Sequence, residues 1–130
     1  MAKIECFEDL NIWKMAREIC RDVCRITRYD EFSRDYKFKE QIRDSSGSVM
    51  DNIAEGFERG GNKEFVQFLA IAKGSSGETR SQLHRSFDYQ YIEEEEYNLL
   101  CQKARNISKS ISALMDYLKK SEIKGTKYKI

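Results

Sequence analysis

The feature that most constrains this chain is the absence of proline from all 130 of its residues. Proline occurs at turns and at the edges of sheets, whereas the interior of an α-helix excludes it. A fold rich in strands or loops would rarely do without a single proline, but a helical bundle needs none. The sequence therefore predicts an all-α protein.

The size and composition fit one globular domain. A chain of 130 residues and 15.3 kDa buries roughly two-thirds of the surface that it exposes when unfolded. Hydrophobic residues make up 40%, and the mean hydropathy is −0.71, which excludes a disordered chain. No apolar run approaches the ~18 residues of a membrane span, and no signal peptide is visible at the N-terminus. We therefore expect a cytoplasmic protein without membrane contact.

Four segments have apolar side chains at the spacing of an amphipathic helix. They run from Glu8 to Arg28, Asp35 to Glu58, Lys63 to Phe87 and Glu94 to Lys120. Four such helices with short connections predict an antiparallel up-and-down four-helix bundle, which forms one domain over residues 1–120. Residues 121–130 add lysines without periodicity and are predicted to be a basic, disordered tail.

A strip of polar side chains borders the apolar face of the second segment. Its members, each three or four positions from the next, are Gln41, Ser45, Ser48, Asn52, Glu55 and Arg59. The strip could form a ligand site, a subunit contact or a structural hydrogen-bond network between helices. The network is favoured because satisfied polar groups fix the register of a bundle. Gly47, Gly74 and Gly77 also predict a close approach of neighbouring helices.

The first segment carries a basic face opposite its apolar face. The cations on this face, all within one arc, are Lys14, Arg17, Arg21, Arg25 and Arg28. They extend over about four turns, or ~21 Å, and could follow a phosphate backbone. The alternative is a solvated face diluted by pairing with Glu18 and Asp22, and the sequence alone slightly favours it. None of the five cations faces the predicted core, so we expect an outward stripe.

Neither the net charge nor the cysteine and histidine residues indicate a further binding or catalytic site. The net charge of +1, from 23 basic and 22 acidic residues, gives no bulk argument for nucleic acid. Cys20 and Cys24 lie one helical turn apart, but a structural zinc site needs a second pair of ligands. Cys101 and His84 could meet as nucleophile and base, yet no catalytic motif flanks either. We predict a protein that is not an enzyme and holds no metal or other cofactor.

Some apolar side chains fall outside the predicted core arcs. These are Val66 and Ile71 in the third segment and Leu99 and Tyr117 in the fourth. Spare apolar positions on so small a bundle predict a surface that other copies cover, and hence a homo-oligomer.

Several short blocks stand out along the chain. They are the stretch FEDLNIWKMA at Phe7–Ala16, then Gln41-Ile42-Arg43, Ser48-Val49, Asn52-Ile53-Ala54-Glu55-Gly56, Phe65–Ala72 with Gly74-Ser75 and Glu78, and Tyr91-Ile92 before a run of acids. Together, over roughly residues 5 to 118, these blocks resemble the family of bacterial four-helix bundle proteins encoded in 23S rRNA intervening sequences. Ser33 stands where that pattern has a proline.

The resemblance implies an antiparallel four-helix bundle that assembles into a homopentamer, and it supplies no catalytic residues. The family is also similar to the accessory variability determinant of diversity-generating retroelements, a basic pentamer that acts with a reverse transcriptase and nucleic acid. Resemblance and basic face together favour a non-enzymatic homo-oligomer that binds RNA or DNA and is associated with an rRNA intervening sequence. The alternative is a pentameric scaffold for a protein partner, such as a reverse transcriptase.

Overall fold

The computed structural model describes the backbone of residues 3–123 and the side chains of residues 3–121. Over this range the secondary structure consists of helices, and no strand is present. The elements are the 3-10 helix η1 (Phe7–Asp9) and the α-helices α1 (Asn11–Ile26), α2 (Asp30–Arg34), α3 (Tyr36–Glu58), α4 (Asn62–Asp88) and α5 (Glu94–Ile123). The prediction of an all-α protein is confirmed.

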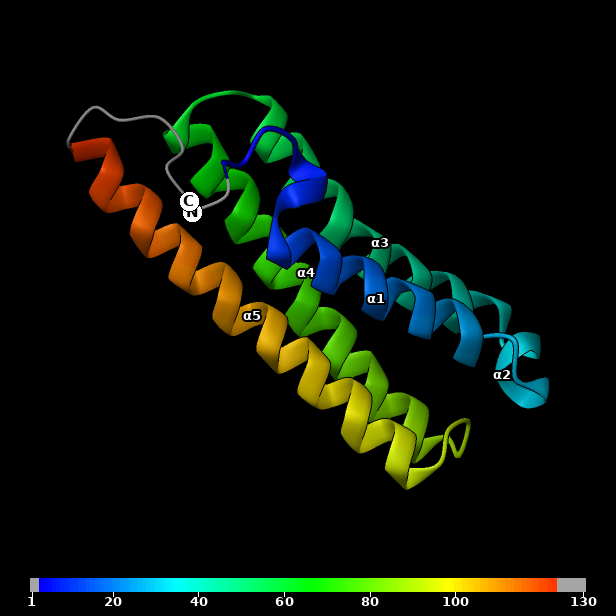
Figure 1. The fold of residues 1–130 in the computed structure, drawn as a ribbon. Helices are drawn as coiled ribbons and strands as arrows, with labels where there is room; N and C mark the ends of the chain where they lie inside the picture. Colours follow the sequence, from blue (N-terminus) through cyan, green and yellow to red (C-terminus); the bar gives the residue numbers. More distant parts are fainter. Residues whose placement is uncertain (1–2, 124–130) are drawn as a thin grey trace.

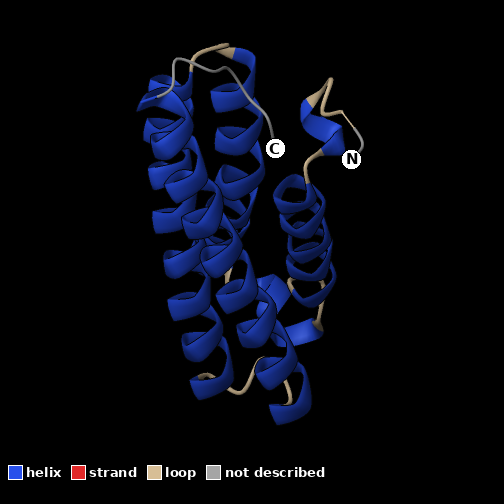
Figure 2. Ribbon diagram, turned by 60° about the vertical axis from the view of Figure 1, so that its left-hand side comes forward, coloured by secondary structure: helices blue, strands red, loops and turns tan. Residues whose placement is uncertain are grey.

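The long helices α1, α3, α4 and α5 lie alongside one another as a helical bundle (Figure 1 and Figure 2). α4 packs against both α3 and α5, and α1 packs against the other side of the same two helices. Because each helix buries its apolar face against two neighbours, the core lies along the bundle axis. No helix within the described range is both long and apolar enough to cross a membrane.

The apolar core has two parts along the axis. The first part joins α1, α3, α4 and α5 through side chains such as Ile19, Ile53, Leu69 and Ile107. The second part lies where α2 meets the bundle and contains Val23, Ile42, Leu83, Leu100 and a group of aromatic rings.

The boundaries of the helices differ from the predicted segments at four places. α1 ends at Ile26, so Arg28, predicted as the last residue of the first helix, lies in the turn that follows it. Leu10, in extended conformation, separates η1 from α1, so the first long helix begins later than Glu8. α2 was not predicted, and it forms because Phe32 is fully buried and stacks on Phe38 at a centroid distance of 5.5 Å. α5 continues to Ile123, three residues past the predicted domain end. The rest of the predicted tail, 124–130, lies outside the described residues.

Ser33 has a backbone role that proline could not fill. Its N–H donates to the carbonyl of Tyr29 at 2.7 Å, and its hydroxyl donates to the carbonyl of Asp30 at 2.8 Å. Proline has no N–H to donate. Ser33 therefore gives the short helix α2 a backbone hydrogen bond that proline at this position could not make.

The predicted close approach at three glycines is wrong, and the tight glycine is a different one. A Cβ at Gly47, Gly74 or Gly77 would meet no described heavy atom within 4 Å outside its own helical turn. A Cβ at Gly56, by contrast, would lie 2.6 Å from Cβ of Phe68. Gly56 is therefore the position where α3 and α4 pack too closely for a side chain.

We expect alanine to have opposite effects at two of these glycines. Gly74→Ala should raise the free energy of unfolding by about 1 kcal/mol, because alanine favours the helix and has open space. Gly56→Ala should lower it by about 1–3 kcal/mol, because the added methyl group meets Phe68. Urea unfolding of both variants beside the parent tests the pair. A loss of stability in Gly74→Ala would mean that a neighbour fills the space around Gly74.

Candidate nucleic-acid interface

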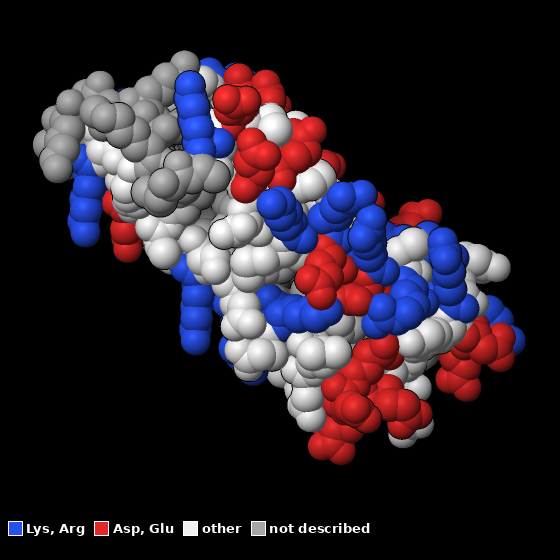
Figure 3. Space-filling model, in the orientation of Figure 1, with Lys and Arg blue, Asp and Glu red and all other residues white. Residues whose placement is uncertain are grey.

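The basic face of α1 points away from the core. The four predicted cations on α1 and Arg28 in the turn after it are exposed, while Ile12, Ala16, Ile19, Val23 and Ile26 on the opposite side of the helix are buried. Figure 3 shows Lys and Arg side chains gathered over α1, with acidic side chains among them. What this surface can bind depends on which of the cations are already paired.

Four of the five cations have no acidic partner among the described residues. Within this part of the chain, no carboxylate lies at ion-pair distance from Lys14, Arg17, Arg21 or Arg28. Arg17 lies over the ring of Trp13, with its guanidinium carbon 5.6 Å from the ring centroid. These four side chains can therefore offer their charge to a bound anion.

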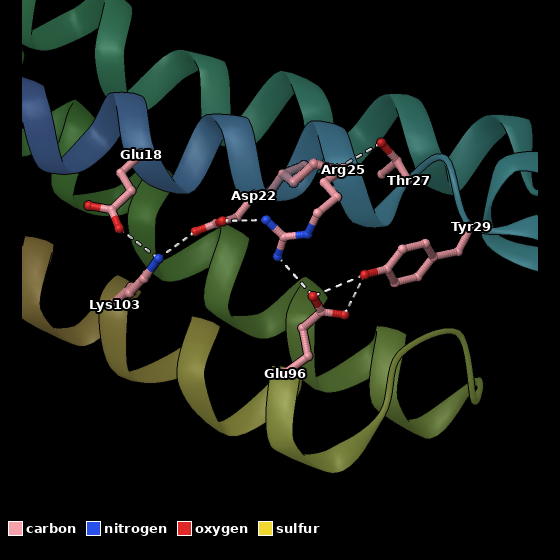
Figure 4. A network of polar contacts seen from close by, with 8 residues as sticks. Glu18, Asp22, Arg25, Thr27, Tyr29, Glu96 and Lys103 are labelled. Carbon is pink, nitrogen blue, oxygen red and sulfur yellow. Dashed lines mark hydrogen bonds and ion pairs between the residues drawn. The ribbon is translucent and has the colours of Figure 1, made fainter.

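Arg25 is the exception, because its exposed side chain is already paired with two carboxylates. Its Nη1 lies 2.7 Å from Oδ1 of Asp22, and its Nη2 lies 2.8 Å from Oε2 of Glu96 in α5 (Figure 4). Tyr29 Oη donates to the same Glu96 carboxylate at 2.9 Å. Hydrogen bonds to Glu96 and then to Asp22 raise the pKa of the Arg25 guanidinium. Arg25 therefore joins α1 to α5.

The two acids beside the basic face, Glu18 and Asp22, are both paired with Lys103 of α5, and of the cations of α1 only Arg25 pairs with one of them among the described residues. Lys103 Nζ lies 2.8 Å from both Glu18 Oε1 and Asp22 Oδ2 (Figure 4). Burial opposes the charge on Lys103, but its hydrogen bonds to Asp22 and Glu18 outweigh that cost, so the pKa of the ammonium is raised. Because Glu18 and Asp22 are held in this way, they do not neutralise Arg17 and Arg21.

The middle of the polar strip on α3 lies in the seam with α4. Ser45 Oγ is 2.6 Å from Oε1 of Gln82 and 2.8 Å from Oγ1 of Thr79. Ser48 Oγ is 2.9 Å from Oγ of Ser75, and Asn52 Nδ2 donates to Ser48 Oγ at 2.9 Å. These polar atoms satisfy one another between two helices, as a structural network requires.

The ends of the polar strip lie on the surface. Glu55 and Arg59 form an exposed ion pair at 3.5 Å, and Arg59 also lies over the ring of Phe68. Gln41 is exposed and borders a cleft between α3 and α4. The structure thus brings three of the six predicted residues into one network, and the partners in α4 were not identified from the sequence.

Cys101 and His84 lie in different environments, one buried and one exposed. Cys101 is buried in the second part of the core, and burial raises the pKa of its thiol. His84 is exposed, and its Nδ1 lies 2.7 Å from Oη of Tyr97. Cys20 and Cys24 are half-buried, and burial raises the pKa of Cys20. Among the residues that the structure describes, no group of three His, Cys, Asp or Glu side chains could hold a metal ion.

Of the four apolar side chains outside the predicted core arcs, three are exposed in the structure and one packs against the core. Ile71, Leu99 and Tyr117 are exposed by 52%, 54% and 39%. Val66 is half-buried and packs against the first part of the core, so its interpretation as a spare position is corrected. Three apolar side chains therefore remain on the surfaces of α4 and α5.

Comparisons with known proteins identify related chains. The family model for the 23S rRNA-intervening sequence protein matches residues 8–113, which contain the basic face and the polar strip. The fold is similar to a crystal structure of a protein of unknown function from the S23 ribosomal protein family of Bacteroides thetaiotaomicron. That pair has a TM-score of 0.72 and 20% identity, and the alignment covers 80% of this chain and 97% of the other. No curated protein matches the chain.

The contacts of Asp22 predict a measurable loss of stability. Asp22→Asn should lower the free energy of unfolding by about 1–3 kcal/mol, because it leaves Arg25 and Lys103 without their buried charged partner. Asp30→Asn is the control, since the Asp30 pair with Arg34 is exposed and should contribute less than about 0.5 kcal/mol. Equal effects of the two variants in urea unfolding would contradict a structural role for Asp22.

Proposed function

The chain belongs to the family of 23S rRNA-intervening sequence proteins, and we propose that it is a non-enzymatic homo-oligomer that binds RNA through the basic face of α1. The observation that carries this proposal is the set of four exposed cations, three on α1 and Arg28 in the turn after it, that lack an acidic partner among the described residues. Their charge supports RNA binding, because side-chain cations that displace condensed counterions from a phosphate backbone raise the affinity of a protein for nucleic acid.

Assembly of several copies would strengthen a weak surface. One basic stripe on a chain of net charge +1 binds a polyanion weakly, but several stripes held in one particle act together on the same strand. The exposed side chains of Ile71, Leu99 and Tyr117 support an interface between copies. The resemblance to the family supports a pentamer.

We also infer the course of the four long helices within one chain. The connections at 59–61 and 89–93 are short, and α3, α4 and α5 pack against their neighbours in sequence. Short connections between packed helices favour an antiparallel up-and-down course of the four long helices.

A cytoplasmic location, and the absence of a cofactor and of catalytic activity, are part of the same proposal.

A second candidate function is a pentameric scaffold for a protein partner, such as a reverse transcriptase. The observation that favours it is the exposure of Leu99 and Tyr117 on α5, because apolar side chains outside the core can bind another protein as well as another copy. Salt separates the two functions: binding through phosphates weakens linearly with the logarithm of salt concentration, whereas binding through an apolar interface need not.

We expect the double variant Arg17→Gln/Arg21→Gln to bind structured RNA more weakly than the parent, whatever the RNA sequence, since contacts to phosphates carry no sequence information. The slope of log affinity against log salt should flatten by roughly one unit for each phosphate that the protein no longer neutralises. Fluorescence anisotropy with a labelled RNA hairpin at several salt concentrations measures both quantities.

The matched control for RNA binding is Lys63→Gln/Lys73→Gln. It removes the same charge from exposed positions on α4 and should change the affinity and the slope much less. If the variant of α1 and the parent bind the hairpin equally at every salt concentration, the basic face is only a solvated surface.

Sedimentation equilibrium at micromolar concentration should show a species several times heavier than the 15.3 kDa chain. Leu99→Ser should shift the distribution toward the single chain, because it removes an exposed apolar side chain from the inferred interface. Asn98→Ser, at the neighbouring exposed position, should leave the distribution unchanged. A parent that sediments only as the single chain would refute the homo-oligomer.

A further inference from the structure

A cleft of about 590 Å³ lies between the start of α3 and the end of α4. Three aromatic rings (Phe38, Tyr89, Tyr91), two cations (Lys37, Arg85) and the amide of Gln41 line most of it. Its volume is in the range of sites for small ligands, which is roughly 300–1,000 Å³. Its lining residues come from the start of α3, the end of α4 and the loop after α4, and none of them belongs to the basic face.

The aromatic wall of the cleft offers a firmly held ring. Tyr89 is 45% exposed, and its ring centroid lies 5.5 Å from that of Phe38 and 5.6 Å from that of Tyr91, with interplanar angles of 69° and 71°. Gln90 between the two tyrosines has a φ of 63°, a left-handed conformation that reverses the chain just after α4. A partly exposed ring with fixed neighbours is suited to stacking on a planar ligand.

The guanidinium of Arg85 contacts two of the aromatic rings of the cleft. Its central carbon lies 4.4 Å from the centroid of Phe38, and its Nη2 donates to Tyr89 Oη at 3.2 Å. No carboxylate in the described part of the chain lies at ion-pair distance from Arg85 or Lys37. A guanidinium that rests on an aromatic ring and has donors left over is well suited to bind a phosphate group.

The acidic groups near the cleft limit the size of an anionic ligand. The Asp35 carboxylate in the wall is already engaged, because it accepts hydrogen bonds from Tyr91 Oη at 2.8 Å and from the N–H of Phe38 at 3.3 Å. Asp44 and Glu78 line the adjoining cleft farther along the same two helices. They would repel a phosphate backbone that continued in that direction, so the site accommodates a short segment only.

We propose that this cleft binds one unpaired nucleotide of an RNA strand, an inference that rests on RNA binding as the proposed function. The base stacks on the ring of Tyr89, and its phosphate lies against Arg85 and Lys37. The amide of Gln41 is placed to hydrogen-bond the edge of the base. Unpaired bases in RNA are commonly held by aromatic rings and guanidinium planes, whereas paired bases are already stacked within the duplex.

The test compares a labelled single-stranded RNA of about 12 nucleotides, a length that suits single-strand binding sites, with the blunt duplex of the same sequence. Tyr89→Ala should weaken binding of the single strand by about 5-fold to 100-fold, which corresponds to the loss of one stacked base. Its effect on the duplex should be small, and Tyr89→Phe should keep most of the affinity because it keeps the ring. Tyr36→Ala, at a 70% exposed position outside the cleft, is the matched control.

Arg85→Gln is a second variant, in case removal of the Tyr89 ring loosens the turn after α4. It should also weaken the single strand more than the duplex, because the phosphate contact that it removes belongs to the unpaired nucleotide. Equal losses on both probes, or no loss in either variant, would overturn the inference. A changed sedimentation profile of Tyr89→Ala would do the same, since it would make the cleft a contact between copies.

The outcomes separate this inference from the proposed function. If Arg17→Gln/Arg21→Gln weakens both probes while the variants of the cleft change neither, RNA binding stands and the nucleotide site fails. If the parent binds neither probe at low salt, the proposed function fails, and the nucleotide site fails with it.

Discussion

The buried carboxylate of Asp22 joins α1 to α5 in the rotation that also buries the apolar side chains of α1, and the cations of α1 turn outward in that rotation. A buried charge must be paired, and Asp22 is paired with Arg25 from its own helix and Lys103 from α5. Once Asp22 faces α5, the 3.6-residue period fixes which side chains enter the core and which turn outward. The basic face is therefore held outward by a contact in which Lys14, Arg17, Arg21 and Arg28 take no part.

Polar contacts also set the position of α3 against α4. The hydroxyl of Ser45 meets Thr79 and Gln82 in the seam, where an unmade hydrogen bond would be costly. A shift of one helix by a turn would break these pairs. It would also move Gly56 away from Phe68, whose side chain leaves no room for a Cβ at position 56. Apolar burial drives the helices together, and these two contacts restrict them to one register. The register, in turn, places Arg85 beside Phe38 at the cleft.

The sequence predicted the long helices and the outward basic face because both depend on spacing within one segment. It missed α2 because five residues carry too little periodicity, and because Phe32 is buried by residues outside α2, among them Phe38 and Tyr91. It misjudged the glycines for a related reason. A glycine in a helix shows that a side chain is missing, but the distance to the neighbouring helix decides whether one would fit.

Arg21 and Arg25 show most clearly what the spacing along a helix determines and what the tertiary contacts decide. They lie one turn apart on the same helix, and the sequence alone determined that both face away from the apolar side. The tertiary structure decided that Arg25 is bound to Glu96, which lies 71 positions farther along the chain, while Arg21 has no carboxylate at ion-pair distance among the described residues. The period of a helix is a local property that any window of the sequence reveals. The partner of a charge depends instead on which helices lie side by side, and that is settled only when all their apolar faces are buried together.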